Sequence, residues 1–101
     1  MRTRSISTHV LETGRGEPAR GLSVELYRQD VLLSMQTTDA DGRIDDLVRG
    51  PLERGTYRLI FRLRGPFFSR VEVEFAVDDP GRHYHIPLLF SPYACTTYRG
   101  S

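Results

Sequence analysis

Three histidines are the side chains in this sequence best suited to acid-base or metal chemistry, and all of them fall in segments with the alternating pattern of β-strands. Successive side chains of a strand point to opposite faces, so residues of equal parity share a face. By this rule His9 lies opposite Val10, and His83 and His85 lie opposite Tyr84. If the apolar faces form the core, all three imidazoles point away from it.

Two kinds of site can be built from these histidines. Three imidazole nitrogens form a ligand set for zinc or another divalent metal. Alternatively, a neutral imidazole takes a proton from water while an arginine stabilises the negative charge that develops on an oxygen. Arg43, which directly follows the turn-forming Asp41 and Gly42, is the candidate arginine for the second kind of site. The plainest alternative is that these residues are ordinary solvent-facing positions of strands.

Cys95 is the only cysteine, which excludes an intrachain disulfide and zinc motifs with two cysteines. A lone thiol acts as a nucleophile when a nearby cation lowers its pKa. No basic residue adjoins Cys95 in the sequence, so we expect an inert, packed thiol. This use of cysteine fits a reducing compartment.

Short strands are the elements that must position these residues. Alternating apolar and polar residues recur at intervals of about 8 to 12 residues, separated by turns such as Asp39–Gly42 and Asp79–Gly81. No segment has the long apolar pattern of period 3.6 that predicts a helix. We therefore predict one all-β domain over residues 1–101, a sandwich in preference to a barrel, with strands at 5–11, 22–26, 31–37, 43–44, 57–63, 71–77, 83–89 and 96–99.

Composition and charge exclude several functions. The fourteen basic residues are all arginine, so a lysine Schiff base and a lysine-based phosphate loop are excluded. Thirteen acidic residues alternate with them and leave a net charge of +1, which argues against a nucleic-acid partner. No apolar run approaches the roughly 18 residues of a membrane span, and no secretory signal is visible. We expect a cytoplasmic protein.

The C-terminal motifs are more specific than any of these patterns. The sequence His83-Tyr84-His85-Ile86-Pro87-Leu88-Leu89 is followed by Ser91-Pro92-Tyr93 and by the ending Thr97-Tyr98-Arg99-Gly100-Ser101. These motifs, together with Ser7-Thr8-His9-Val10-Leu11, Gly16-Glu17-Pro18-Ala19 and Thr38-Asp39-Ala40-Asp41-Gly42-Arg43, resemble the 5-hydroxyisourate hydrolases, the transthyretin-related proteins of purine catabolism. The Tyr-Arg-Gly-Ser ending is the feature that separates these hydrolases from transthyretin itself.

The resemblance implies a transthyretin-like (prealbumin-like) sandwich of eight strands in two four-stranded sheets. It also implies a homotetramer whose active sites lie in a channel between dimers. Family members usually carry a short helix between the fifth and sixth strands, and here the chain passes from Phe61 to Val71 through little more than Gly65-Pro66-Phe67-Phe68. We therefore expect this helix to be missing.

The resemblance further implies the activity: water opens one ring of 5-hydroxyisourate at a cyclic amide-type carbonyl and gives 2-oxo-4-hydroxy-4-carboxy-5-ureidoimidazoline. The matching positions assign water activation and proton relay to His9 and His85. Arg43 orients the substrate and stabilises the oxyanion, and the Tyr98 hydroxyl bonds to substrate or water. Which histidine is the base stays open, His83 is secondary, and no cofactor or metal is expected.

Two other functions remain open on the sequence. A non-catalytic, transthyretin-like carrier of small molecules would share the fold. A structural prealbumin-like module would share the Asp-Gly turn and the sequence Gly55-Thr56-Tyr57-Arg58. The presence of His9, Arg43 and His85, together with the Tyr-Arg-Gly-Ser ending, weighs against the carrier. A structural module has no reason to place histidines on one outer face.

Overall fold

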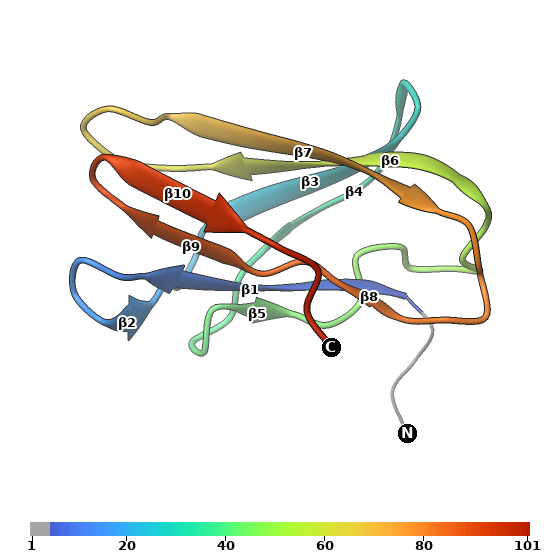
Figure 1. Ribbon diagram of the computed structural model, residues 1–101, viewed down its shortest axis with the longest axis horizontal. Coiled ribbons are helices and arrows are strands. Elements are labelled where there is room, and N and C mark those ends of the chain that lie inside the picture. Colours follow the sequence, from blue (N-terminus) through green and yellow to red (C-terminus); the bar gives the residue numbers. More distant parts are fainter. Residues whose placement is uncertain (1–4) are drawn as a thin grey trace.

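The structure is a computed structural model that describes residues 5–101, and this part of the chain consists of strands and loops without a helix (Figure 1). The strands follow the alternating segments of the sequence closely, and the strand predicted at 31–37 has the predicted bounds. In chain order they are β1 (Ile6–Glu12), β2 (Glu17–Pro18), β3 (Ser23–Arg28), β4 (Val31–Thr37), β5 (Arg43–Ile44), β6 (Gly55–Arg62), β7 (Arg70–Val77), β8 (Tyr84–His85), β9 (Leu88–Ser91) and β10 (Ala94–Thr97).

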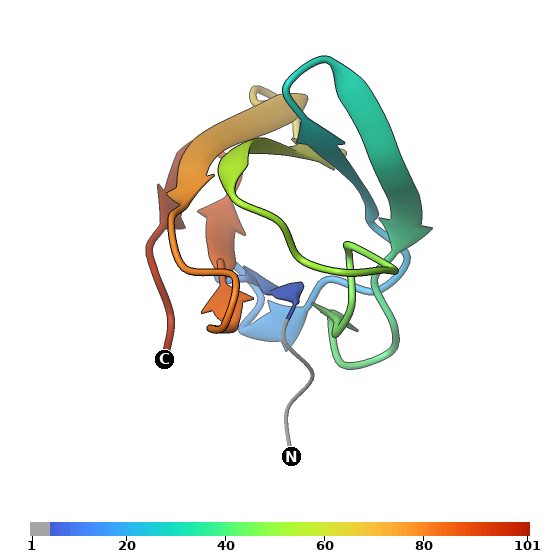
Figure 2. The ribbon, with the colours of Figure 1, turned by 90° about the vertical axis from the view of Figure 1, so that its right-hand side faces the viewer.

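The strands form two sheets that face each other, as the end-on view shows (Figure 2). One sheet has four antiparallel strands in the order β4-β3-β6-β7. The other follows the order β10-β9-β1-β2, and the short strands β5 and β8 also pair with β1. Strand β1 is therefore the centre of its sheet, antiparallel to β2 and β5 and parallel to β8 and β9. The predicted all-β sandwich is confirmed.

The core lies between the sheets, where the apolar residues of alternating parity meet. In β1, Ile6, Thr8 and Val10 are at most 1% exposed, whereas His9 is half-buried on the opposite face. In the four-stranded sheet the equivalent inward residues include Leu26, and the core as a whole is made of aliphatic side chains with a few aromatic rings. The parity rule for His9 is thus confirmed.

The number of strands differs from the prediction, because ten short strands replace eight and six of them share one sheet. The strand predicted at 83–89 is divided into β8 and β9 at Pro87, which has no N–H to donate to the ladder. Thr8 helps to hold the break, since its hydroxyl donates to the Ile86 carbonyl at 2.6 Å. The register with β1 is the same before and after the break, with Ser7 beside His85 and Val10 beside Leu88.

The last strand begins and ends two residues earlier than the predicted bounds of 96–99. The tight turn after Ser91 pairs this residue with Ala94, so β10 begins there and ends at Thr97. Tyr98, which the sequence placed in a strand at 96–99, therefore lies in the segment that follows β10.

The connection between β6 and β7 contains no helix, as expected from the short sequence there. The N–H of Leu63 donates to the carbonyl of Ser69 at 2.9 Å and closes the loop. Phe67 and Phe68 pack edge to face within it, with ring centroids 4.9 Å apart, and Phe68 also contacts the core. Within residues 5–101 no helix could cross a membrane.

Candidate active site

Three of the four predicted site residues meet on the outer face of the sheet centred on β1. His9 stands directly opposite Arg43 of β5, and its neighbour on the same face, Ser7, lies beside His85 of β8. Paired strands are about 4.8 Å apart, so these side chains are close neighbours across the sheet. His9 and His85 are half-buried and Arg43 is exposed, so the group faces outward from the sandwich.

A tight turn sets the position of Arg43. Gly42 has a φ of 76°, and a Cβ at this residue would collide with the Val10 carbonyl oxygen, so both the conformation and the close approach require glycine. The Val10 N–H donates to the Gly42 carbonyl at 2.8 Å and ties the turn to β1. Arg43 therefore leaves the turn already in register with His9.

Asp39 places a negative charge beside these two residues. One oxygen of its carboxylate accepts the N–H groups of Arg43 and Asp41, each at 2.9 Å. The hydrogen bond from Arg43 is the main reason that the pKa of Asp39 lies below its ordinary value, and the Asp41 N–H and the charges of Arg43 and His9 lower this pKa further. The carboxylate thus stays ionised and balances part of the positive charge of the site.

His85 is held between a serine and a glycine. The Ser7 hydroxyl oxygen lies 2.8 Å from Nδ1 of the His85 ring. On the backbone side, the N–H of Gly100 donates to the His85 carbonyl at 2.7 Å. A Cβ on Gly100 would lie 2.6 Å from Cδ2 of the ring, so only glycine fits against this imidazole without moving it.

His83 belongs to the same cluster through Ser7. Its Nε2 lies 2.7 Å from the Ser7 hydroxyl oxygen, and its Nδ1 accepts the backbone N–H of Ser5 at 3.2 Å. Ser7 is only 5% exposed, and its single hydroxyl therefore connects the two imidazoles. Ser7 is not among the residues predicted for the site, although its equal parity with His9 places it on this face.

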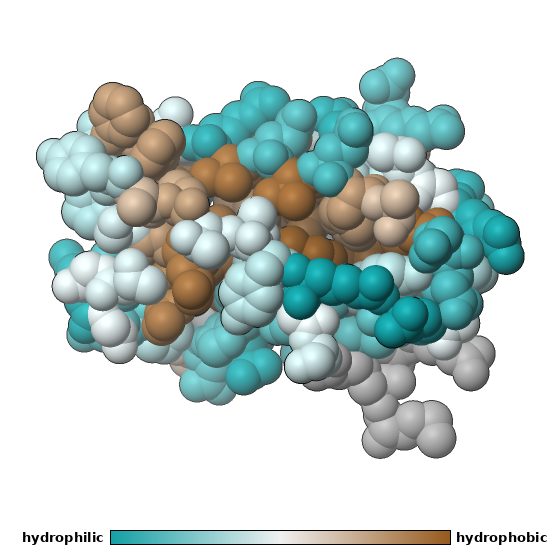
Figure 3. All heavy atoms as spheres, in the orientation of Figure 1, coloured by the Kyte–Doolittle hydropathy of each residue, from teal (hydrophilic) through white to brown (hydrophobic). Residues whose placement is uncertain are grey.

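Tyr98, the fourth predicted residue, lies apart from this cluster. Its side chain is 53% exposed and lines a cavity of about 230 Å³ between β7 and the C-terminal segment, with Val73 and Phe75 on the other side. Hydrophobic side chains gather over this region in the space-filling view (Figure 3). In the part of the chain that the structure describes, no hydrogen bond joins Tyr98 to His9, Arg43 or His85. Its role in binding substrate stays a prediction.

Cys95 does not join the histidines. It packs against the core from β10, and burial raises the pKa of its thiol above the ordinary value. A raised pKa keeps the sulfur protonated and weakly nucleophilic at neutral pH. Across residues 5–101, no three side chains of His, Cys, Asp or Glu are arranged to hold a metal ion.

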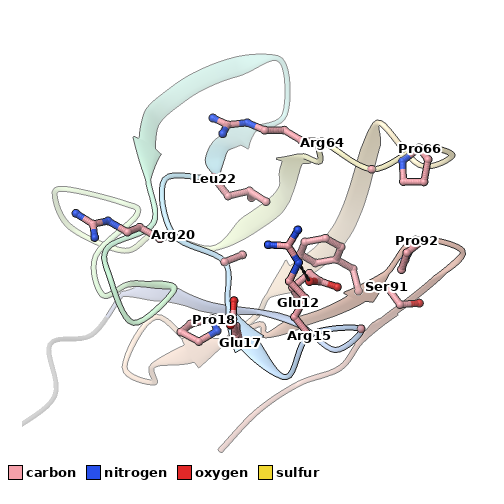
Figure 4. Close-up of a pocket in the computed structure, with 14 residues that line it drawn as sticks. Glu12, Arg15, Glu17, Pro18, Arg20, Leu22, Arg64, Pro66, Ser91 and Pro92 are labelled. Atoms are coloured by element: carbon pink, nitrogen blue, oxygen red, sulfur yellow. Dashed lines mark ion pairs between the residues drawn. The ribbon is translucent and has the colours of Figure 1, made fainter.

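A second cavity, of about 510 Å³, lies near the far end of β1 and contains none of the predicted site residues. Glu12 and Arg15 form an ion pair at 3.5 Å beside it, and Pro92 and Arg64 close it from two other loops (Figure 4). Positive and negative side chains both line its rim, so the cavity does not favour a ligand of either charge.

The cluster on the outer face of β1 can therefore carry out acid-base chemistry on an anionic or polar substrate. Two imidazoles supply proton transfer, because a neutral imidazole has one nitrogen that donates a proton and one that accepts it. The guanidinium of Arg43 supplies a planar fork for carboxylate or carbonyl oxygens. All of these groups project from paired strands, which hold them more rigidly than loops would.

Comparisons with known proteins agree in both sequence and structure. A model of the HIUase/Transthyretin family matches residues 6–100. The 5-hydroxyisourate hydrolase of Deinococcus radiodurans is 38% identical over 113 residues, which are 95% of this chain and 95% of that protein. The solved structure of the Klebsiella pneumoniae 5-hydroxyisourate hydrolase has a TM-score of 0.89 and 34% identity, with all of both chains covered. Sea bream transthyretin, solved in complex with thyroxine, has a TM-score of 0.83 and 26% identity, and the match covers 94% of this chain and 93% of that one. The chain is a member of the HIUase/Transthyretin family.

Proposed function

We propose that this protein hydrolyses 5-hydroxyisourate. The observation that carries the proposal is the pairing of His9 with Arg43 across β1 and β5, with His85 one strand away on the same face. The relatives in Deinococcus radiodurans and Klebsiella pneumoniae, which match nearly the whole chain, are named for this activity.

The proposed bond-breaking steps use water and the side chains on this face. Arg43 binds oxygens of the planar substrate, and one imidazole takes a proton from a water molecule. The water oxygen attacks a cyclic amide-type carbonyl carbon, and the electron pair of the C=O bond moves to its oxygen, where Arg43 and the second histidine stabilise the charge. When this electron pair returns, the ring C–N bond breaks and the first imidazolium gives its proton to the leaving nitrogen. One water is thus added across one bond, and Tyr98 would bind the substrate or the water from the C-terminal segment.

We propose further that the protein acts as a homotetramer in the cytoplasm. Arg43 is exposed and His9 is only half-buried in the single chain, so bulk water reaches the site from the open side. A second subunit packed over this face would exclude that water and strengthen the electrostatic interactions. Light scattering of the purified protein tests this assembly, and a fully active monomer would overturn it.

A transthyretin-like carrier and a structural module are weaker alternatives. Both would share the sandwich, but neither needs a carboxylate and two imidazoles beside a guanidinium that a glycine-dependent turn holds in place. A purely structural surface would be more soluble with its charged residues spread over its area than with several polar and charged groups gathered in one place.

The direct test is the decay of freshly generated 5-hydroxyisourate, followed by ultraviolet absorbance with and without the protein. We expect a large acceleration that His9→Ala reduces by about 10² to 10⁴-fold, the usual range for a general acid or base. Arg15→Ala, a change of an exposed arginine beside the other cavity, serves as the control and should be fully active. Wild-type protein that leaves the decay rate unchanged would rule out the proposed function.

A further inference from the structure

We infer that Ser7 is a positioning residue that holds His85 in the tautomer with its proton on Nε2, so that His85 donates a hydrogen bond to the substrate and His9 takes the proton from water. This inference rests on the proposed function and deepens it, because the mechanism above left the two histidines interchangeable. Three hydrogen bonds connect Ser5, His83, Ser7 and His85 in a row.

The first bond in the row has a fixed direction. The backbone N–H of Ser5 can only donate, and it points at Nδ1 of His83 from 3.2 Å. Nδ1 must therefore carry a lone pair, and the proton of the neutral ring must sit on Nε2. Ser5 is fully buried and its carbonyl accepts the Tyr84 N–H at 2.9 Å, so its backbone is held in place from both sides.

The donor in the first bond also determines which atoms donate in the two bonds of Ser7. Nε2–H of His83 donates to the Ser7 hydroxyl oxygen at 2.7 Å. The hydroxyl has a single proton, and it can donate this proton to Nδ1 of His85 at 2.8 Å. Nδ1 of His85 is then an acceptor, so the proton of its neutral ring is on Nε2. If the hydroxyl accepted from both rings instead, its own proton would have no acceptor within residues 5–101, at a residue that is only 5% exposed, and a hydrogen bond would be lost.

The opposite direction would place two donors against each other. It requires Nδ1–H on His85, a hydroxyl proton aimed at Nε2 of His83, and a proton on Nδ1 of His83 that faces the Ser5 N–H. A fully protonated His83 ring gives the same clash with Ser5. Opposed donors at a half-buried site forfeit a hydrogen bond and add repulsion, which makes these arrangements unfavourable.

The consequence is a division of labour between the two histidines. An imidazole whose Nδ1 accepts from Ser7 presents Nε2–H, so it can donate to a substrate oxygen but cannot take a proton from water at that nitrogen. His9 is the other imidazole on the face, opposite Arg43 and within the electrostatic influence of the Asp39 carboxylate. Of the two imidazoles, His9 is therefore the one left to take the proton from water.

The tautomer can be measured directly. Long-range ¹H–¹⁵N spectra of histidine-labelled protein distinguish a protonated Nε2 from a protonated Nδ1 at neutral pH. We expect the Nε2–H form for His85 in the wild type and a mixture of both forms in Ser7→Ala, with kcat about 10 to 100-fold lower, the range typical of partners that orient a functional histidine. Ser7→Thr, which keeps the hydroxyl, should restore the Nε2–H form and most of kcat.

Ser34→Ala is the matched control. Ser34 is a comparably buried serine on the other sheet, and its hydroxyl donates to the Leu47 carbonyl and not to a histidine. Its loss should lower stability without changing the His85 spectrum or kcat. A purely structural role for Ser7 predicts that Ser7→Ala behaves in the same way.

A second pair of variants tests which histidine is the base. Glutamine keeps an N–H donor near the place of Nε2 but cannot take a proton, so kcat should fall about 10² to 10⁴-fold in His9→Gln and markedly less in His85→Gln. Equal losses, or a wild-type spectrum with the proton on Nδ1 of His85, would overturn the inference while hydrolysis by the wild type still supported the proposed function. The wild-type spectrum decides the tautomer even if Ser7→Ala does not fold, and it does so independently of whether 5-hydroxyisourate is the substrate.

Discussion

Gly100 lies against the edge of the His85 ring. Its N–H donates to the His85 carbonyl at 2.7 Å, and an added Cβ would lie 2.6 Å from Cδ2 of the imidazole. The ring is therefore confined on one side by the C-terminal segment and on the other by the Ser7 hydroxyl. The C-terminal segment thus contributes to the site because Gly100 has no Cβ that would displace the His85 ring.

Gly100→Ala should lower activity while leaving the fold intact. The new methyl group would push the His85 ring away from Ser7, and a displacement of about 1 Å at a catalytic group costs about 10²-fold in rate. Gly50→Ala is the control, because nothing lies within 4 Å of a Cβ at Gly50. Initial rates with 5-hydroxyisourate, together with circular dichroism for folding, compare the two variants. Equal activity in both would show that the contact between Gly100 and His85 does not constrain the ring.

Arg43→Ala should reduce kcat by about 10² to 10³-fold, the usual cost of removing an oxyanion donor, and should also raise KM. Its backbone hydrogen bonds to Asp39 do not involve the guanidinium, so the turn should persist. Steady-state kinetics measure both parameters, and Arg20→Ala, an exposed arginine beside the larger cavity, should match the wild type. An Arg43→Ala protein with unchanged kcat would remove Arg43 from the site.

Glu25 should make stability depend on pH. It is buried on the outer face of the four-stranded sheet, and hydrogen bonds from Arg62 at 2.7 and 3.3 Å are the main reason that its pKa lies below the ordinary value of 4.5. A lowered pKa means that the folded state favours the carboxylate. Its contribution is therefore complete above pH 4.5 and is lost as the pH falls through the lower, folded value.

Glu25→Gln tests this dependence. We expect the variant to lose about 1 kcal/mol of unfolding free energy at pH 7, a modest value because Arg62 is partly exposed and its charge is screened. The difference between wild type and variant should shrink as the pH falls from 5 toward 3. Urea unfolding at several pH values measures it, and a constant difference across this range would contradict the assigned pKa shift.

Prolonged chelation should leave activity intact, because the proposed mechanism gives His9, His83 and His85 no role as metal ligands. The measurement is the rate of 5-hydroxyisourate decay before and after dialysis against a chelator. Activity that disappears with the chelator and returns with zinc would favour the three-histidine metal site that the sequence also allowed.

The sequence predicted the faces of the strands well because side-chain alternation is a local property. His9 opposite Val10 and His85 opposite Tyr84 needed only the period of two, and the structure places Val10 and Tyr84 in the core. The break at Pro87 left these faces unchanged, since the register with β1 is the same before and after it.

Contacts between distant strands were not predictable in this way. The bonds of Ser7 to His83 and His85 join residues 76 and 78 positions apart, and they depend on the register of two parallel strands. The end of β10 before Tyr98 depends on the geometry of the Ser91–Ala94 turn. Neither feature can be predicted from adjacent residues, whereas the tight turn at Gly42 can be predicted from the turn-forming residues Asp39–Gly42 alone.

The central place of β1 also has a consequence for how the molecule folds. Strand β1 is among the first segments of the chain, yet its neighbours on one side, β8 and β9, follow almost eighty residues later. Closing such a long loop carries a large entropic cost, and chains dominated by distant pairings fold slowly. The row from Ser5 to His85 spans this closure, so the candidate site is completed only when β1 pairs with β8. In a refolding experiment, enzymatic activity should return with the slowest phase, after most of the β4-β3-β6-β7 sheet, whose pairings are nearer in sequence, has formed.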